Sequence, residues 1–179
     1  CSYREMTEWV LPTEQQKALA AITKHGQDNS DWSDTEQFLR GGFWRNFRVK
    51  YPEANEMYSR MLQISNRLEE LSSDQTMDGQ FDRLDEARIE LYRAQCNCAY
   101  WHGAFGGLYL PHLRNAIFHH LIAADNILEE VTGRSGRWVK IEADDYNCDL
   151  RKEIRISTDR LVAFLAPARG GHLYELDIR

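Results

Sequence analysis

Hydrophobic residues recur at helical spacing along the first 134 residues of the chain. The clearest pattern is a seam in which apolar residues follow one another at alternating steps of four and three, formed by Met57, Met61, Ile64, Leu68 and Leu71. We predict that this helix begins at Pro52, because proline suits the first turn of a helix. By the same reasoning we predict five more helices, over 13–25, 35–39, 43–51, 81–95 and 111–132.

The period changes to two after residue 135, where apolar residues alternate with polar neighbours around Val139 and Ile154. Apolar runs at 161–165 and 172–178 predict two further strands. The predicted fold class is therefore mainly α: a bundle of three long helices with short extra helices, followed by a few antiparallel β-strands of an incomplete β-sandwich. The predicted domains are a helical-bundle domain over 1–134 and a truncated β-sandwich domain over 135–179.

The composition is that of a moderately acidic globular chain, with 42% hydrophobic and 28% charged residues and a net charge of -6 among 179 residues. This charge argues against nucleic acid and against an anionic membrane surface as partners. No window approaches ~18 uninterrupted apolar residues, and no signal peptide is visible. Four scattered cysteines indicate reduced thiols and a cytoplasmic setting. Cys1 fits either a lipidated first residue or an arbitrary cut, and the apolar residues after it favour the cut.

The densest candidate for chemistry is the stretch from Gln95 to Pro111, which combines an amide pair, a histidine, four large aromatic residues and three glycines. Sugar sites need this mixture, because pyranose rings stack on aromatic faces while their hydroxyls bond to amides and imidazoles. The same aromatic residues could instead be core packing at a helix junction, with His102 a satisfied core histidine. A third interpretation is a metal site formed by Cys96, Cys98, His102 and His112, although their spacing matches no closed zinc pattern.

Other catalytic signatures are absent from the sequence, including a phosphate loop, a GxSxG elbow and an HExxH motif. A retaining glycosidase needs two carboxyl groups ~5 Å apart, and no residue pair stands out for that role. The acidic residues Asp144, Asp145 and Asp149 suit a solvated turn. The sequence therefore predicts no catalytic residue, no metal ligand and no cofactor.

The string from Gln95 to Arg114 resembles the fifth conserved region of glycoside hydrolase family 57, the α-amylases and 4-α-glucanotransferases. Its neighbours agree: residues 2–12 are similar to the segment that leaves the catalytic barrel of that family, and residues 41–61 resemble the opening of its helical bundle. Residues 166–177 resemble an early strand pair of its C-terminal β-sandwich. The resemblance covers almost the whole chain in order.

This resemblance implies that a (β/α)₇ barrel outside the present sequence supplies a glutamate nucleophile and an aspartate acid/base. These residues would act by retaining double displacement on an α-1,4-glucan or maltooligosaccharide, while the bundle closes one wall of the cleft. The chain alone would then be inactive. The implied substrate-binding residues are Trp101, which would stack on a glucose ring, His102, which would bond to a hydroxyl, and Tyr100, Asn97 and Trp9.

Two points stay open at the level of sequence. Cys98 occupies a position where many glucanotransferases of the family have an acidic residue, which mildly favours an amylase-like or uncharacterised branch over a transferase. The alternative function is a free-standing helical binding or protein-interaction module without enzymatic activity. A bundle separated from its barrel would expose the face that met it, and such a patch could form a homo-oligomer.

Overall fold

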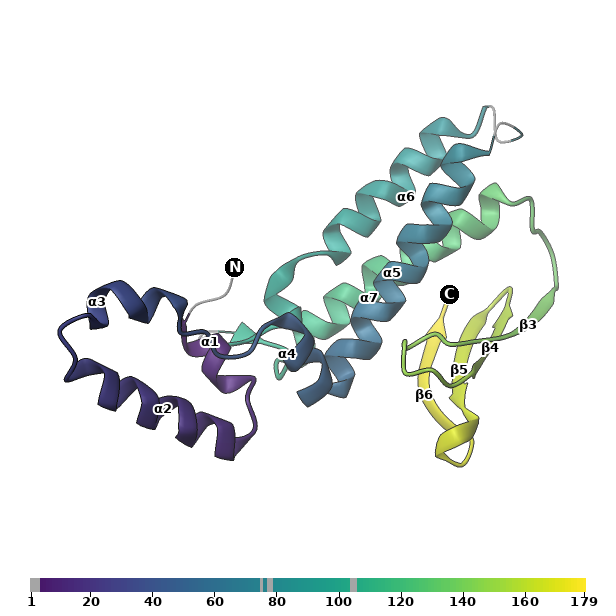
Figure 1. Cartoon of the computed structure of the whole chain (residues 1–179). Coiled ribbons are helices and arrows are strands. Elements are labelled where there is room, and N and C mark those ends of the chain that lie inside the picture. Colours follow the sequence, from purple (N-terminus) through teal and green to yellow (C-terminus); the bar gives the residue numbers. More distant parts are fainter. Residues whose placement is uncertain (1–3, 75, 77–78, 104–105) are drawn as a thin grey trace. The chain divides into compact units, whose positions relative to one another are not determined.

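The computed structural model of the chain describes residues 4–74, 76, 79–103 and 106–179. The chain divides into two compact units, Cys1–Asn55 and Glu56–Arg179, and each is described by itself. The predicted boundary between the helical-bundle domain and the β-sandwich domain, at residue 135, falls inside the second unit. The division into these two domains stays a prediction. Figure 1 shows the elements along the chain, coloured from purple at the N-terminus to yellow at the C-terminus.

The N-terminal unit is helical. Its elements are α1 (Arg4–Trp9), α2 (Thr13–Gln27), α3 (Trp32–Thr35), the 3₁₀ helix η1 (Glu36–Phe38) and α4 (Trp44–Lys50). The small core of the unit is formed by Met6, Val10, Leu11, Phe47 and Ala54. No residue of α2 is buried, so this helix contributes little to that core.

Helix α2 begins at Thr13, as predicted, but it ends two residues later than the predicted range of 13–25. No side chain caps its first turn. Gly26 lies inside the helix instead of ending it. A Cβ at Gly26 would lie 2.0 Å from an indole carbon of Trp32. This glycine therefore serves the packing of the tryptophan against the helix.

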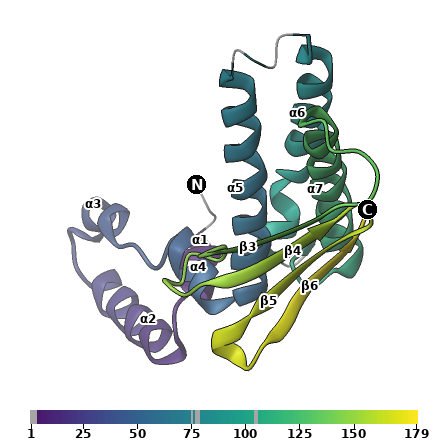
Figure 2. The same ribbon diagram turned by 90° about the vertical axis from the view of Figure 1, so that its right-hand side faces the viewer.

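The C-terminal unit contains the three predicted long helices: α5 (Pro52–Ser73), which starts at the unit boundary, α6 (Phe81–Ala94) and α7 (Pro111–Val131). Helices α6 and α7 lie side by side and run antiparallel (Figure 2), since Arg83 pairs with Glu130 and Glu90 with His120. Their buried faces are apolar, as the helical spacing predicted. These faces are formed by Leu84, Ala87, Leu91, Ala94, Ile117, Leu121, Ala124 and Leu128.

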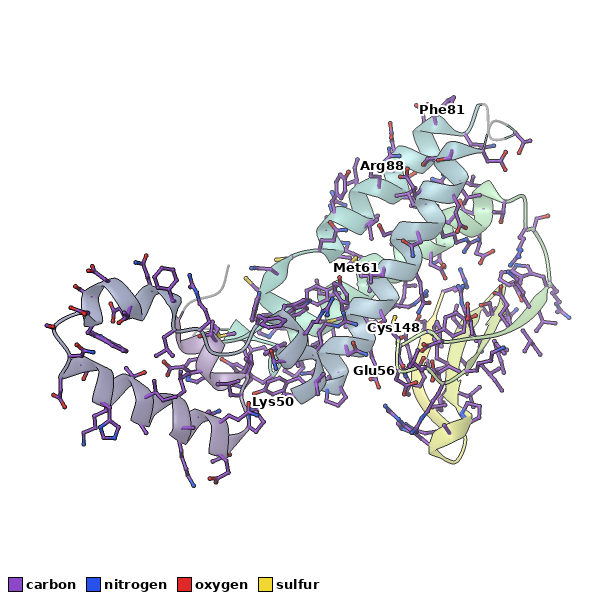
Figure 3. All side chains as sticks on the ribbon, viewed as in Figure 1. Lys50, Glu56, Met61, Phe81, Arg88 and Cys148 are labelled. Carbon is purple, nitrogen blue, oxygen red and sulfur yellow. The ribbon has the colours of Figure 1, made fainter. Side chains whose placement is uncertain are left out.

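The predicted seam of α5 is confirmed in its main part. Met57, Ile64 and Leu68 are buried, whereas Met61 and Leu71 are half-buried. Phe81, which the periodicity assigned to the apolar face of α6, is instead mostly exposed. The reason is its place in the first turn of the helix, where Figure 3 shows it at the free end of the bundle.

The predicted strands form one antiparallel sheet of four strands in the order β3-β4-β5-β6. The strands are β3 (Val139–Asp144), β4 (Glu153–Thr158), β5 (Leu161–Ala166) and β6 (His172–Ile178). A register shift between Phe164 and Leu165 interrupts the pairing of β5 with β6. This arrangement confirms the mainly α fold class followed by a few antiparallel strands.

The two faces of this sheet are reversed relative to the usual burial of apolar residues. The apolar outer face is exposed or half-buried, and its residues are Val139, Ile141, Ile154, Ile156, Leu173, Leu176 and Ile178. The opposite face is buried and contains Glu153, Arg155, Ser157, Val162, Phe164, Glu175 and Asp177. Burying charged groups is costly unless each is paired, so this face needs charged partners.

Those partners come from α5 and α7. Arg60 on α5 pairs with Glu175 and Asp177 of β6, and Asp125 on α7 pairs with Arg155 of β4. We call the whole group the Asp125 cluster, formed by Arg60, Arg67, Asp125, Glu129, Arg155, Glu175, Asp177 and Arg179. Outside the cluster, Glu56 near the start of α5 pairs with Arg169 and faces the sheet in Figure 3. The sheet is therefore attached to the helices largely through charges.

Candidate functional site

The stretch that the sequence selected forms the connection from α6 to α7. A 3₁₀ helix, η3 (Asn97–Tyr100), follows α6, and two very short strands, β1 (His102–Gly103) and β2 (Gly106–Gly107), form a hairpin before Pro111 starts α7. Ala104 and Phe105, which belong to the same sequence string, lie outside the described residues. The described part of the connection therefore contains a 3₁₀ helix and two paired strands, in which His102 faces Gly107 and Gly103 faces Gly106.

Tyr100 fixes the start of this connection. Its hydroxyl donates a hydrogen bond of 2.9 Å to the carbonyl oxygen of Ala94, the last residue of α6. Burial raises the pKa of this phenol above its usual range, with a smaller contribution from Cys96, so the hydroxyl stays a donor at neutral pH. Because Tyr100 is only 6% exposed, the structure gives it a supporting position in the packing.

The hairpin brings Trp101 and His102 against Gly107. His102 pairs with Gly107 across the two strands, and Leu108 donates a hydrogen bond of 2.5 Å to the carbonyl oxygen of Trp101. Gly107 has a φ of 152°. A Cβ at this position would lie 2.4 Å from the Trp101 carbonyl oxygen. The close approach of the two strands therefore requires glycine here.

Tyr109, two residues after β2, packs its ring against the ring of His102. The rings of His102 and Tyr109 have their centroids 4.9 Å apart at an angle of 50°. The Tyr109 hydroxyl donates a hydrogen bond of 2.9 Å to the carbonyl oxygen of Gly103. Arg114, from the first turns of α7, also donates to the carbonyl oxygen of Leu108. Tyr109 therefore packs against the half-buried His102 ring, while the two hydrogen bonds fix the backbone at Gly103 and Leu108.

The predicted site residues fall into three groups. Trp101 and His102 lie together on the hairpin and are half-buried, while Asn97 is exposed at the start of η3. Tyr100 is buried beneath them in the same connection. Trp9 belongs to the N-terminal unit, where it is 42% exposed and its carbonyl oxygen accepts a hydrogen bond from Lys50. An indole, an imidazole and an amide thus remain accessible to a ligand that has both apolar faces and hydroxyls.

The ligands of the alternative metal site do not form a group. Cys96, Cys98 and His112 are exposed. Within the described ranges, no three His, Cys, Asp or Glu side chains are placed so that they could hold a metal ion. His120 is half-buried and its Nδ1 lies 2.6 Å from a carboxylate oxygen of Glu90, which gives this histidine a structural partner.

Sequence reasoning did not find the Asp125 cluster, which is the largest group of interacting charges in the C-terminal unit. A signal was present, because Asp125 follows Ala124 within the apolar stripe of α7, between Leu121 and Leu128. A carboxylate inside an apolar stripe is rarely buried without a partner. The partners lie 30 to 65 residues away along the chain, so their identity was not visible from spacing.

Comparison with known proteins agrees with this arrangement. Residues 42–128 match the family model for the middle domain of alpha-amylase/4-alpha-glucanotransferase, and residues 145–179 match the model for the C-terminal region of the same enzymes. The chain belongs to the alpha-amylase/4-alpha-glucanotransferase family. The conserved-region string from Gln95 to Arg114 lies inside the matched middle domain.

Individual relatives of this family carry both enzyme names. Over 178 residues the chain is 38% identical to Alpha-amylase 1 of Dictyoglomus thermophilum, covering 99% of this chain and 24% of that protein. It is 38% identical to the 4-alpha-glucanotransferase of Thermococcus kodakarensis over 175 residues, which is 98% of this chain and 23% of that protein. The chain thus spans about a quarter of the length of the curated relatives it matches.

A solved structure shows the same fold. The crystal structure of the 4-alpha-glucanotransferase from Thermococcus litoralis superposes with a TM-score of 0.74 at 36% identity, covering 99% of this chain and 25% of that one. Among the described residues, no helix combines the length and the apolar character that crossing a membrane requires.

Proposed function

We propose that this chain is the non-catalytic segment of a retaining enzyme that acts on α-1,4-glucans, and that its helical bundle forms one wall of the substrate cleft. Two relatives named as an alpha-amylase and as a 4-alpha-glucanotransferase support the substrate class. The observation that carries the proposal is the hairpin between α6 and α7, which presents Trp101 and His102 on a braced backbone. In the whole enzyme, the (β/α)₇ barrel would supply the catalytic carboxylates.

The geometry suggests a division of roles within the site. Trp101 would stack on a glucose ring, because its indole is a large apolar surface beside hydrogen-bonding groups. His102 would bond to a sugar hydroxyl, with its ring oriented by Tyr109. Asn97 would add an amide contact. Trp9, in the N-terminal unit, is proposed by itself as a further sugar contact. Tyr100 would support the connection through Ala94 and not touch the sugar itself.

The isolated chain is expected to hydrolyse no maltooligosaccharide. A retaining mechanism needs two accessible carboxyl groups ~5 Å apart. Glu175 and Asp177 are neighbours, but their side chains are only 7% and 6% exposed and are held by Arg60. Incubation of the purified chain with maltoheptaose, followed by a reducing-end assay, should give the same signal as buffer. Maltoheptaose hydrolysis that survives rigorous purification, and that one carboxylate substitution in this chain abolishes, would contradict this part of the proposal.

In the whole enzyme that contains this segment, Trp101→Ala should lower kcat/KM on maltooligosaccharides about tenfold to hundredfold. A stacked aromatic ring contributes roughly 1–3 kcal/mol, and 1.4 kcal/mol corresponds to about tenfold in rate. The matched control is Tyr92→Ala, since Tyr92 is a mostly exposed aromatic residue on α6 outside the hairpin. Steady-state kinetics with thermal unfolding on both variants provides the test. If Trp101→Ala unfolds the bundle, but the enzyme molecules that remain folded are fully active, then Trp101 is a core residue and not a substrate contact.

The second candidate function is a protein-interaction module. The exposed apolar outer face of the sheet favours it, because monomeric proteins rarely expose a large contiguous apolar patch. Self-association that depends on concentration and is insensitive to added maltoheptaose would favour this function. Retention of maltoheptaose by the hairpin, lost in Trp101→Ala, would favour the glucan-binding function.

A further inference from the structure

Asp125 is the centre of an almost completely buried charge cluster between the helices and the sheet. Its side chain is 2% exposed, and its carboxylate lies 3.2 Å from Arg60, 3.1 Å from Arg67, 3.0 Å from Arg155 and 2.9 Å from Arg179. Four guanidinium groups on one carboxylate make an Asp125 anion favourable, even in a low-dielectric site. At this end of the cluster the guanidinium groups therefore outnumber the carboxylates, even with Glu129 beside Arg67 and Arg179.

The other end of the cluster has the opposite imbalance. Arg60 is fully buried, and besides Asp125 it lies 3.0 Å from Glu175 and 3.5 Å from Asp177. Among the described residues, Arg60 is the one cation within ion-pair distance of these two carboxyl groups. One guanidinium that is already shared with Asp125 thus faces two further carboxyl groups.

The two carboxyl groups are close because of the strand geometry. Glu175 and Asp177 are two residues apart on β6, so their side chains point to the same face of the sheet. That face is turned toward the helices, and both carboxyl groups lie within ion-pair distance of the same guanidinium group, that of Arg60. A proton on one of two adjacent carboxyl groups removes one negative charge and lets that group donate a hydrogen bond, whereas ionised carboxylates only accept. Two adjacent carboxylates also repel each other strongly when buried.

We propose that Glu175 and Asp177 share one proton at neutral pH, as a carboxylic acid and a carboxylate beneath Arg60, and that loss of this proton to solvent base loosens β6 from α5. We call Glu175, Asp177 and Arg60 the latch, because they join the sheet to the helical bundle. In its protonated form the pair carries one negative charge, which Arg60 can match. In its deprotonated form the pair carries two negative charges, and neither carboxylate can donate a hydrogen bond.

The direction of the pH effect follows from the protons bound in each state. Burial raises the pKa of Glu175 from 4.5 to about 8, and the neighbouring Asp177 adds to this, while Arg60 acts in the opposite direction. The folded chain therefore holds a proton that the unfolded chain has released above pH 4.5. Stability from this group is full below that pH and is lost as pH rises through about 8.

Several other charged or titratable groups surround the pair and enter the same balance. They come from every element packed around it and comprise Arg60 and Glu56 on α5, Asp125 on α7, Glu153 and Arg155 on β4, Tyr146 before β4, and Tyr174 on β6. Tyr174 has a pKa raised above its usual range by burial and by the surrounding carboxylates. It therefore remains neutral over the pH range in which the latch is expected to respond.

The first test is a direct titration of the wild-type chain. Carbon-13 NMR of the glutamate side-chain carboxyls, assigned with Glu175→Gln and with the control Glu70→Gln at an exposed position of α5, should show Glu175 titrating at least two pH units above the ordinary value of 4.5. A Glu175 midpoint near 4.5 would overturn the proposal. This measurement needs only the folded wild-type protein, so it stands even if a variant folds poorly.

The second test measures the consequence for β6. Amide hydrogen exchange in wild-type protein should show protection factors for 174–178 falling about tenfold or more between about pH 6 and about pH 9. Glu175→Gln cannot lose a proton and should abolish this fall, whereas the control Glu70→Gln should retain it. Asp177→Asn should lower the Glu175 midpoint, because it removes the neighbouring negative charge. A fall of equal size in Glu175→Gln would show that the pair is not the latch.

Discussion

At the scale of single residues, Gly107 decides whether the hairpin can present Trp101 and His102. The two strands approach so closely that a Cβ at Gly107 would lie 2.9 Å from the His102 Cα as well as 2.4 Å from the Trp101 carbonyl oxygen. Both neighbours are backbone atoms, which cannot move away as a flexible side chain can. The positive φ adds strain for any residue with a Cβ.

Gly107→Ala is therefore expected to destabilise the C-terminal unit by about 2 kcal/mol or more, since the backbone strain alone amounts to roughly 1–3 kcal/mol. Urea unfolding followed by circular dichroism is the measurement. The matched control is Gly103→Ala in the same hairpin, where a Cβ would meet the Gly106 carbonyl oxygen at 3.4 Å and should be tolerated. Equal stability of the two variants would mean that the hairpin relaxes around the new methyl group.

At the scale of elements, the sheet has its charged face buried and its apolar face outward. Alternation along β4 and β6 separates the two kinds of residue, but it does not state which face meets the helices. Phe164 is the large apolar residue on the buried face, with the guanidinium groups of Arg60 and Arg155 at 5.1 Å and 5.8 Å from its ring centre. Charge pairing together with these cation–π contacts joins β4, β5 and β6 to α5 and α7.

Asp125→Asn should cost about 3–5 kcal/mol of unfolding free energy, because it leaves four arginines, three of them with largely buried side chains, facing a neutral side chain. The control Asp85→Asn removes an exposed carboxylate paired with Arg88 on α6, and should cost less than about 1 kcal/mol. Chemical denaturation of both variants would reveal the difference. A small effect at Asp125 would mean that the helices and the sheet are joined mainly by apolar contacts.

Acid should weaken the same junction in wild-type protein. Burial alone would raise the pKa of Asp125, but Arg60, Arg155, Arg179 and Arg67 outweigh it and hold the pKa well below its ordinary value of 3.8. The stabilisation is therefore present above that pH and is lost progressively as pH falls below it. Together with the opposite trend at Glu175, this places the most stable range of the cluster in mildly acidic solution.

At the scale of the whole molecule, the chain corresponds to about a quarter of the relatives it matches. Its sheet presents a broad apolar face on the side away from the helices. A sheet of this kind is normally covered by a second layer, with the two inner faces packed about 10 Å apart. In a solution of the isolated chain, we expect the same apolar face of a second copy to form this second layer.

The isolated chain is therefore expected to self-associate as its concentration rises. The double variant Ile141→Lys and Ile178→Lys places two charges on the outer face and should shift the chain toward the monomer in sedimentation velocity experiments. The matched control is Val49→Lys, because Val49 is an exposed apolar residue of α4 in the N-terminal unit. If the control and the double variant behave alike, the outer face is not the contact.

The sequence by itself determined the long helices, the four strands of the main sheet and the family. Helix starts at Pro52 and Pro111, the buried seam of α5 and the four strands depend on local periodicity and backbone restriction, which short stretches of chain contain. The string from Gln95 to Arg114 identified the family because its residue types and spacing are long enough to be specific. The order of these elements then implied mainly helical structure followed by a sheet.

Tertiary structure alone decided how these elements join and which site residues remain accessible. Tyr100 and Trp101 are adjacent aromatic residues, yet one is buried on the Ala94 carbonyl and the other is half-exposed, because η3 turns between α6 and the hairpin. The buried face of the sheet was decided by the pairing of Arg60 with Asp177, two residues that are 117 positions apart. Such pairings depend on the spatial meeting of charges, which no local pattern encodes.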